Sequence, residues 1–196
     1  MLIARSRLRS IGLLFLIATI DTGGALRAHD RSAPGPRVVM IIRHAEKPEK
    51  EGEKDPNLSK RGFERAEALA KAIPEHFPKP DFLIATKRSK SSNRPAETIT
   101  PLSNALHEPI EAKFKDDDYA RVAREVLSDP KYAGKVVLIA WHHGKIPELA
   151  KALGAKDAPA KWKSSVFDRV WEIDYQNGTA TLKNLPENAL PGDSQN

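Results

Sequence analysis

Three short apolar runs, separated by helix-like segments, limit the folds that this chain can adopt. Residues 37–42 (RVVMII), 82–85 (FLIA) and 136–141 (VVLIAW) are continuously apolar rather than alternating in polarity. Continuous runs of this length are typical of strands that are buried on both faces, as in a parallel sheet. Their alternation with helical patterns predicts an α/β three-layer sandwich, with a mostly parallel central sheet and helices on both faces.

The helical patterns lie between and after these runs. Ser59 is a candidate N-cap for a helix that extends to Ile73 and that Pro74 would stop. The spacing of three and four predicts that its apolar face contains Phe63, Ala66, Ala70 and Ile73.

A second helix is expected after Asn93, a candidate N-cap, with Pro95 in the first turn and Pro101 kinking or dividing it. Further helices are expected at residues 119–127 and at residues 146–153, the last closed by Gly154.

A hairpin is expected near the C-terminus. Asn177-Gly178 lies between two strand-like runs, residues 166–175 and 179–182. Asn-Gly between such runs is a strong signal for a tight antiparallel turn, which predicts an antiparallel hairpin at the edge of the sheet.

Composition narrows the range of functions. The 196 residues suit one domain of ordinary size, and the absence of cysteine excludes disulfides, thiol nucleophiles and cysteine-ligated metal sites. The net charge of +6 favours anionic partners. Nucleic acid is not expected as a partner, because aromatic residues make up only 6% and no basic stripe with interleaved aromatics is present.

The first residues are typical of a secretory signal peptide. Three arginines precede an apolar run at residues 11–20, and small residues follow at 23–25. We expect a signal peptide at 1–28 with cleavage near 25–28, a flexible lead-in at 29–36, a domain at 37–185 and a tail at 186–196. The run is shorter than the ~20 residues that span a bilayer, so the processed protein is expected to be exported, periplasmic or secreted, with no stable membrane insertion. An uncleaved anchor and a buried helix are the alternatives.

Polar residues follow the predicted strands. Arg43-His44 comes directly after the first apolar run, His142-His143 comes after the third, and Arg94 opens the helix after the second. In open α/β sheets ligands bind outside the carboxyl ends of the strands, so we expect these side chains to share one edge. Guanidinium binds phosphate bidentately, and a neutral imidazole can attack phosphorus. Arg94 also ends a basic loop, residues 87–94, of a kind that is commonly only solvent-exposed.

Four motifs in this order resemble those of the histidine phosphatase superfamily, which has the phosphoglycerate mutase-like fold. RHAEKP at residues 43–48 resembles the family's Arg-His-Gly-Glu signature, with alanine in place of glycine. LSKRG at residues 58–62 resembles the stretch that follows it, and RPAET at residues 94–98 resembles the segment with the second phosphate-binding arginine. VVLIAWHHGKIP at residues 136–147 resembles the strand and turn with the second catalytic histidine.

The resemblance implies a phosphomonoester hydrolase that needs no metal or cofactor. His44 would attack phosphorus and become a phosphohistidine, with its other ring nitrogen donating to a backbone carbonyl. Arg43, Arg94 and one histidine of the pair would bind the phosphoryl oxygens. The Trp141-x-His143 pattern favours His143, whereas the His-x-x-x-Ile spacing favours His142. Only one of the two is expected to line the pocket, since successive strand residues face opposite sides.

The family also implies a general acid, for which two candidates are present. Glu111, with Phe114 three places on, resembles the family pattern, and the run Asp116-Asp117-Asp118 is the competing candidate. The substrate is expected to be a small-molecule or protein-borne phosphomonoester.

Three other functions remain open from the sequence. One is a phosphoglycerate mutase-type phosphotransferase, which a small chain without an obvious lid makes less favourable. Another is a non-catalytic phosphate- or phosphoester-binding protein of the same fold. The third is a metal-binding protein that would use His44, Glu46 and the histidine pair, which the charges of Arg43 and Arg94 oppose.

Overall fold

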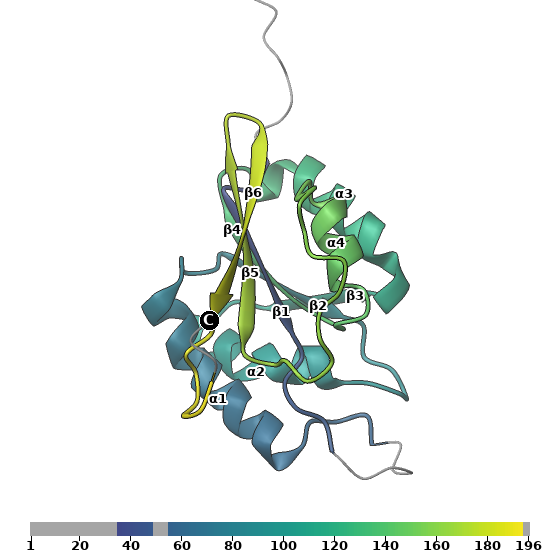
Figure 1. The fold of residues 1–196 in the computed structure, drawn as a ribbon, viewed down its shortest axis with the longest axis vertical. Coiled ribbons are helices and arrows are strands. Elements are labelled where there is room, and N and C mark those ends of the chain that lie inside the picture. Colours follow the sequence, from purple (N-terminus) through teal and green to yellow (C-terminus); the bar gives the residue numbers. More distant parts are fainter. Residues whose placement is uncertain (1–34, 49–54, 194–196) are drawn as a thin grey trace, which may run out of the picture. The chain divides into compact units, whose positions relative to one another are not determined.

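A computed structural model describes residues 35–48 and 55–193, and the expected signal peptide lies outside them. In chain order, the elements are β1 (Val38–Arg43), α1 (Lys60–His76), β2 (Phe82–Thr86), α2 (Arg94–Leu106), β3 (Ile110–Phe114), η1 (Asp116–Asp118), α3 (Tyr119–Ser128), η2 (Pro130–Tyr132), β4 (Val136–Trp141), α4 (Ile146–Ala152), β5 (Arg169–Gln176) and β6 (Thr179–Pro186). The described residues form one mixed sheet with helices packed against it (Figure 1).

The sheet has the order β3-β2-β4-β1-β5-β6. The first four strands in this order pair in parallel, whereas β5 is antiparallel to both β1 and β6. The mostly parallel sheet with an antiparallel edge hairpin is therefore confirmed. Strand β3 was not predicted. It is a short edge strand in which only Phe114 is buried, and it lacks the continuous apolar run of a central strand.

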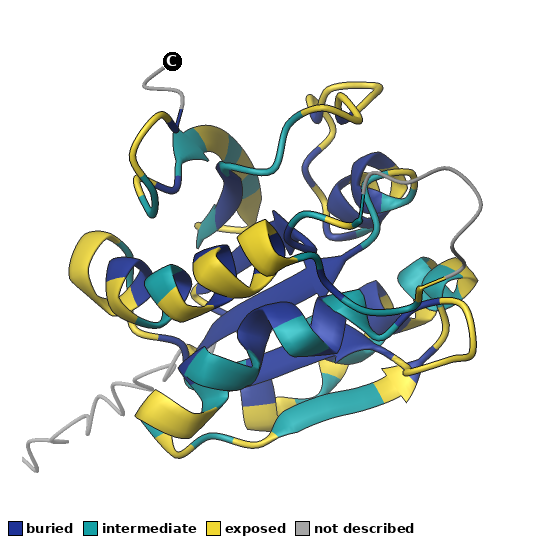
Figure 2. Ribbon diagram, turned by 90° about the horizontal axis from the view of Figure 1, so that it is seen from below, coloured by how far each residue is buried: buried dark blue, intermediate teal, exposed yellow. Residues whose placement is uncertain are grey.

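Two apolar cores lie on opposite faces of the sheet. Along β1, Val39 and Ile41 pack with residues of α3 and α4. The alternate residues Val38, Met40 and Ile42 pack with residues of α1 and α2. Successive strand residues point to opposite faces, so a continuous apolar strand supplies both cores. Figure 2 shows the buried sheet between the two helical layers, which confirms the three-layer architecture.

Helix α1 begins as predicted but ends later and turns a different face to the core. The Ser59 side chain accepts a hydrogen bond from the Gly62 N–H, which confirms this N-cap. The helix continues through Pro74 to His76, because a proline near the end of a helix costs few backbone bonds. Phe63, predicted to face the core, is 47% exposed, while Arg65 is buried.

Helix α2 is continuous from Arg94 to Leu106 with Pro101 inside it, so the proline does not divide the helix. The predicted cap by Asn93 is not formed: its backbone is already in the helical region, at φ −108° and ψ −10°, and its side chain makes no capping bond. Its side-chain amide N–H donates to the Asn57 side chain at 3.0 Å.

The predicted hairpin is confirmed. Asn177 and Gly178 both have positive φ, 50° and 75°, as a tight turn between twisted strands requires. β6 extends to Pro186, four residues beyond the predicted strand.

A buried charged cluster joins α1 to the C-terminal segment. Arg65 forms ion pairs with Glu46 at 2.9 Å, Glu187 at 3.2 Å and Asp193 at 2.9 Å. Glu187 is fully buried, and burial raises its pKa well above the ordinary value although the Arg65 charge opposes this. Part of the segment that was expected to be a tail is thus packed into the domain.

Replacing Arg65 with methionine is expected to lower the free energy of unfolding by about 3–5 kcal/mol, because it leaves buried carboxylates without their partner. Urea denaturation would measure the loss. Arg61→Met is the control on the same helix, since the Arg61–Glu64 pair is 3.9 Å long and half exposed. Such pairs contribute about 0–1 kcal/mol. Equal losses in both variants would contradict a special role for the buried cluster.

No helix in the described part of the chain is long and apolar enough to cross a membrane.

Candidate active site

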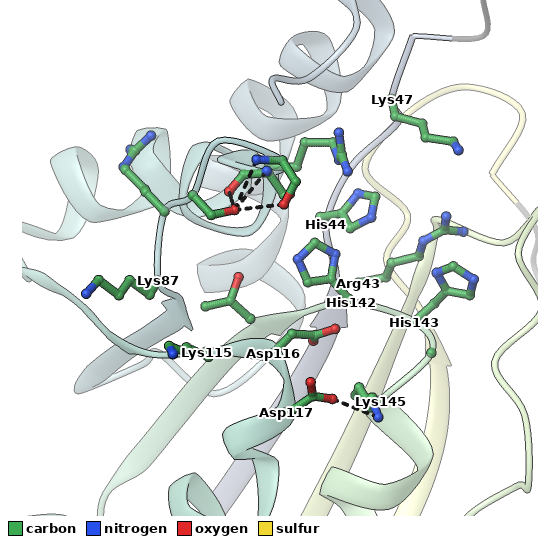
Figure 3. Close-up of a pocket in the computed structure, with 17 residues that line it drawn as sticks. Arg43, His44, Lys47, Lys87, Lys115, Asp116, Asp117, His142, His143 and Lys145 are labelled. Carbon is green, nitrogen blue, oxygen red and sulfur yellow. Dashed lines mark hydrogen bonds and ion pairs between the residues drawn. The ribbon is translucent and has the colours of Figure 1, made fainter. Parts of the chain in front are cut away.

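A cavity of about 760 Å³ lies at the carboxyl ends of the parallel strands. Its walls come from the segments that follow β1, β2, β3 and β4, as expected for an open α/β sheet. The lining residues are Arg43, His44, Lys47, Thr86, Lys87, Arg88, Ser89, Ser91, Ser92, Arg94, Lys115, Asp116, Asp117, His142, His143, Gly144 and Lys145. Many of them are shown in Figure 3.

The segment after β1, residues 44–46, is fixed by bonds from three parts of the fold. The His44 N–H donates to the Trp141 carbonyl at 3.0 Å. The Ala45 N–H donates to Thr98 Oγ1 at 2.9 Å, and the Glu46 carbonyl accepts from the Ser59 N–H at 2.9 Å. The motif at residues 94–98 therefore also positions this segment, through Thr98.

Helix α1 packs closely beneath the same segment at Gly62. A Cβ at this position would come within 2.3 Å of the Glu46 carbonyl oxygen. The glycine in the LSKRG motif is thus required by close backbone approach, which holds the segment against the helix.

The His44 ring is held in the orientation that nucleophilic attack needs. Its Nδ1 lies 2.7 Å from the Ala45 carbonyl oxygen, which can only accept, so Nδ1 carries the proton. Burial lowers the pKa of His44 to about 3, and the neighbouring charges of His142, Arg43 and Arg94 act in the same direction. The imidazole is therefore neutral at pH 7, with Nε2 as an unprotonated nitrogen.

Both histidines of the pair line the cavity, which corrects the expectation that only one would. The His142 ring centroid lies 5.1 Å from that of His44, in an edge-to-face arrangement. The alternation of strand side chains ends at Trp141, because the chain then turns and the Lys145 N–H donates to the His142 carbonyl at 2.9 Å. The geometry favours His142 beside His44, whereas the Trp141-x-His143 pattern favoured His143.

Arg43 is buried and has its guanidinium fixed from one side. Nη1 donates to the carbonyls of Ser164 at 2.6 Å and Val166 at 3.0 Å, and the guanidinium lies 3.7 Å from the centroid of the Phe167 ring. Burial lowers the pKa of Arg43 to about 10, so it remains charged at pH 7. Its Nε is buried with no hydrogen-bond partner among the described residues.

Arg94 enters the cavity from the first residue of α2. One of its nitrogens, Nη1, donates to the Asp55 carbonyl at 3.0 Å, while Nε is buried with no partner among the described residues. Burial lowers the pKa of Arg94, which the charges of Glu97 and Asp55 oppose. Two guanidinium groups therefore reach one cavity with donor groups still available.

The structure does not place Glu111 at the site. Its carboxylate is bound by the Tyr132 hydroxyl at 3.2 Å and by Lys113, on a different surface of β3. Burial raises the pKa of Glu111, but Lys113 and Lys131 lower it overall, so the carboxyl is ionised. The expectation that Glu111 is the acid is therefore not supported, because the edge strand directs it away from the cavity.

The competing candidate, Asp116, lines the cavity. Its Oδ1 is buried with no hydrogen-bond partner among the described residues, and its backbone carbonyl accepts from Trp141 Nε1 at 3.1 Å. Burial and the charge of Asp117 raise the pKa of Asp116 to about 6, against the opposing charge of Lys145. A carboxyl with this pKa can hold a proton near neutral pH and then release it.

Glu46 does not converge with the histidines, as a metal site would require. Its carboxylate is bound to Arg65. Within residues 35–48 and 55–193, no group of three or more histidine, aspartate or glutamate side chains has a metal-binding arrangement.

Positive charge dominates the cavity, which is lined by seven lysine or arginine residues and two aspartates. The sequence patterns indicated Arg43 and Arg94 but not the lysines. The basic loop at residues 87–94 was the available signal for Lys87 and Arg88, although such loops are commonly only solvent-exposed. The site as a whole can bind a phosphoryl group between guanidinium groups and a neutral imidazole.

Comparison with solved structures identifies the fold. A mycobacterial glucosyl-3-phosphoglycerate phosphatase with inorganic phosphate aligns with 76% of this chain and 95% of its own, at 15% identity and a TM-score of 0.52. The protein histidine phosphatase SixA complexed with tungstate aligns over 76% and 97%, at 13% identity and a TM-score of 0.56. A phosphoglycerate mutase from Bacillus anthracis str. Sterne aligns over 78% and 94%, at 16% identity and a TM-score of 0.52.

The chain therefore has the fold of the histidine phosphatases and phosphoglycerate mutases, as the motifs predicted. No protein-family model matches the sequence, and no curated protein sequence matches it.

Proposed function

We propose that the protein is a phosphomonoester hydrolase that acts through a phosphohistidine on His44 and needs no metal. The observation that carries this proposal is the His44 ring itself, buried at a strand end with Nδ1 bonded to a carbonyl and Nε2 unprotonated. The fold it shares with phosphatases of two kinds supports the same conclusion.

In the first step, the Nε2 lone pair of His44 attacks phosphorus and the P–O bond to the leaving group breaks. Arg43, Arg94 and His142 bind the phosphoryl oxygens and stabilise the charge that develops on them. Asp116 donates its proton to the leaving oxygen. In the second step, Asp116 accepts a proton from water as that water attacks phosphorus, the P–N bond breaks, and phosphate leaves with His44 neutral again.

Hydrolysis is favoured over phosphoryl transfer by the chain between Arg94 and β4. Residues 107–135 include β3, η1, α3 and η2, which extend the sheet and cover one of its faces. They build the domain itself instead of a separate lid that would exclude water from a phosphohistidine.

A panel of phosphomonoesters, with and without EDTA, tests the proposed function directly. We expect release of inorganic phosphate at the same rate with and without the chelator. A protein that binds the esters but releases no phosphate would support the non-catalytic alternative. Loss of activity in EDTA would contradict the metal-independent mechanism.

Asparagine substitutions of the two adjacent histidines are expected to be unequal. His142→Asn should lower kcat/KM by about 10²–10³-fold, because the shorter asparagine side chain cannot place its N–H donor where the imidazole N–H reaches the phosphoryl oxygens. His143→Asn should lower it by less than about tenfold, since His143 lies farther along the turn. Steady-state kinetics of both variants would measure the two losses. A larger loss in His143→Asn would show that His143 is the second catalytic histidine, as the Trp141-x-His143 pattern favoured.

Arg94→Ala is expected to lower kcat/KM by about 10²–10³-fold, because a charge-assisted contact to the phosphoryl group is lost in a shielded site. Arg94→Lys should restore only part of the activity, since lysine lacks the planar fork of guanidinium. Lys90→Gln is the control, because Lys90 is exposed in the preceding loop and does not line the cavity. Full activity of Arg94→Ala would show that Arg94 belongs to the solvent-exposed basic loop and does not bind the phosphoryl group.

We also propose that the protein is exported, on the basis of the arginines and the apolar run in the first 28 residues. Cell fractionation with N-terminal sequencing of the mature chain would test this. A new N-terminus between residues 26 and 29 is expected, and an intact cytosolic chain would contradict export.

A further inference from the structure

Two buried hydroxyl groups that line the active-site cavity have no hydrogen-bond partner among the described residues. Thr86 and Ser92 line the cavity and are 3% and 7% exposed. Their Oγ1 and Oγ atoms are buried without a hydrogen-bond partner among the described residues. A buried hydroxyl that makes no hydrogen bond costs free energy, so such groups in a cavity are suited to a bound polar ligand.

Three cationic side chains that form no ion pair among the described residues line the same cavity. Lys87, Arg88 and Lys115 line the cavity and are exposed, and none of them forms an ion pair within the described residues. Lys145, which lines the cavity elsewhere, is by contrast paired with Asp117 at 2.9 Å. Figure 3 shows Lys87 and Lys115 on one side of the cavity and His143 on the other.

This arrangement is built into the fold. The Lys87 N–H donates to the Phe114 carbonyl at 2.6 Å, which holds the ends of β2 and β3 together. The loop that follows is closed on itself, because the Ser89 N–H donates to the Ser92 carbonyl at 3.0 Å and the Ser92 N–H donates to Ser89 Oγ at 3.1 Å. Hydroxyl and cationic groups therefore share a defined place, which we call the β2–β3 subsite (Thr86, Lys87, Arg88, Ser92 and Lys115).

The cavity is large enough to hold more than the transferred phosphoryl group. Its volume of about 760 Å³ falls within the range of ~300–1,000 Å³ that is typical of sites for drug-sized ligands. A phosphoryl group on His44 would be held by Arg43, Arg94 and His142, which leaves the β2–β3 subsite to the rest of the substrate.

We propose that the β2–β3 subsite binds a second anionic group, so that the preferred substrate is a phosphomonoester whose leaving group carries another phosphate or a carboxylate. Hydroxyl donors and unpaired cations, with no carboxylate in the subsite, are the groups that recognise such an anion. Because the hydroxyls are buried within the same cavity as His44, the subsite fits a compact, small-molecule polyanion. The inference rests on the proposed function in one respect, namely that His44 marks the phosphoryl site.

The test measures binding in a variant that does not turn over its ligand. Isothermal titration of His44→Ala would compare glucose 6-phosphate with glucose 1,6-bisphosphate, and with tripolyphosphate as a flexible polyanion. Glucose 1,6-bisphosphate, tripolyphosphate or both are expected to bind at least about tenfold more tightly than glucose 6-phosphate, because the additional anionic group forms charge-assisted contacts. In the added background of Lys87→Gln and Arg88→Gln, that preference should fall to within about threefold.

Lys90→Gln, added to His44→Ala with Lys87 and Arg88 unchanged, is the control. Lys90 lies in the same loop and is exposed, but it does not line the cavity, so the preference should remain. Two results would overturn the proposal: equal affinity for all three probes, or an equal loss of preference in the Lys90 control, which would indicate only the general field of the loop. Both results are independent of whether the wild-type protein hydrolyses any ester, which separates this test from that of the proposed function.

Discussion

Replacing His44 with alanine is expected to abolish turnover, with a loss of at least about 10⁴-fold in kcat. Removing a nucleophile eliminates the covalent route altogether, and losses of this size or larger are typical of nucleophile knockouts. The assay is release of p-nitrophenol from p-nitrophenyl phosphate. Wild-type protein quenched in base should retain phosphate on histidine, whereas the variant should not.

Two controls make the His44 result interpretable. His44→Asn keeps a polar side chain at this buried position and should be equally inactive, with the circular dichroism and melting temperature of the wild type. His76→Ala changes an exposed histidine at the end of α1 and should keep full activity. A folded His44 variant with a near-normal rate would refute the phosphohistidine mechanism.

Asp116→Asn is expected to lower kcat/KM for an alkyl phosphate by about 10²–10⁴-fold, the contribution of a positioned general acid. The effect on p-nitrophenyl phosphate should be much smaller, because p-nitrophenolate leaves without needing a proton. Glu111→Gln is the matched control and should leave both rates unchanged, since Glu111 lies outside the cavity. The reverse pattern would identify Glu111 as the acid after all.

The pH profile gives an independent check of the same assignment. Burial raises the pKa of Asp116 to about 6, so the protonated form that can act as an acid is present below that pH and is lost above it. The kcat/KM of the wild type for an alkyl phosphate should therefore fall as the pH rises through about 6. In Asp116→Asn, kcat/KM should fall less over the same pH range, because the variant has no carboxyl group that loses its proton there. His44 does not contribute to this change in kcat/KM near pH 6, because its pKa is about 3.

Five of the six strands and the sheet edge where the candidate site lies were predictable from local sequence patterns. Continuous apolar runs identified β1, β2 and β4, and Asn177-Gly178 identified the hairpin, because these signals act over a few residues. The Ser59 N-cap was predictable for the same reason. His44 followed from its position directly after a strand, and Arg94 from its position at the start of the helix that follows the next strand, since the carboxyl ends of parallel strands share an edge.

The roles within the site depended on tertiary structure, because they are set by where the chain turns after each strand. His142 lies beside His44 because the alternation of side chains stops at Trp141, and no local pattern showed where the turn begins. The same holds for the carboxyl groups, since the edge strand β3 directs Glu111 away from the cavity and the turn after it brings Asp116 in.

The buried face of helix α1 depends on residues far away in the sequence, which the helical pattern alone does not show. Periodicity predicted an apolar face for α1 that included Phe63, yet the helix buries Arg65. The carboxylates that accept this charge, Glu187 and Asp193, lie 122 and 128 residues away along the chain. The sequence by itself determined the layers, the strand-end position of the candidate site and the two arginines that line it. The folded chain alone decided which imidazole lies beside His44, which carboxyl group lines the cavity and which ion pair is buried under α1. These features depend on contacts between residues that are far apart in sequence.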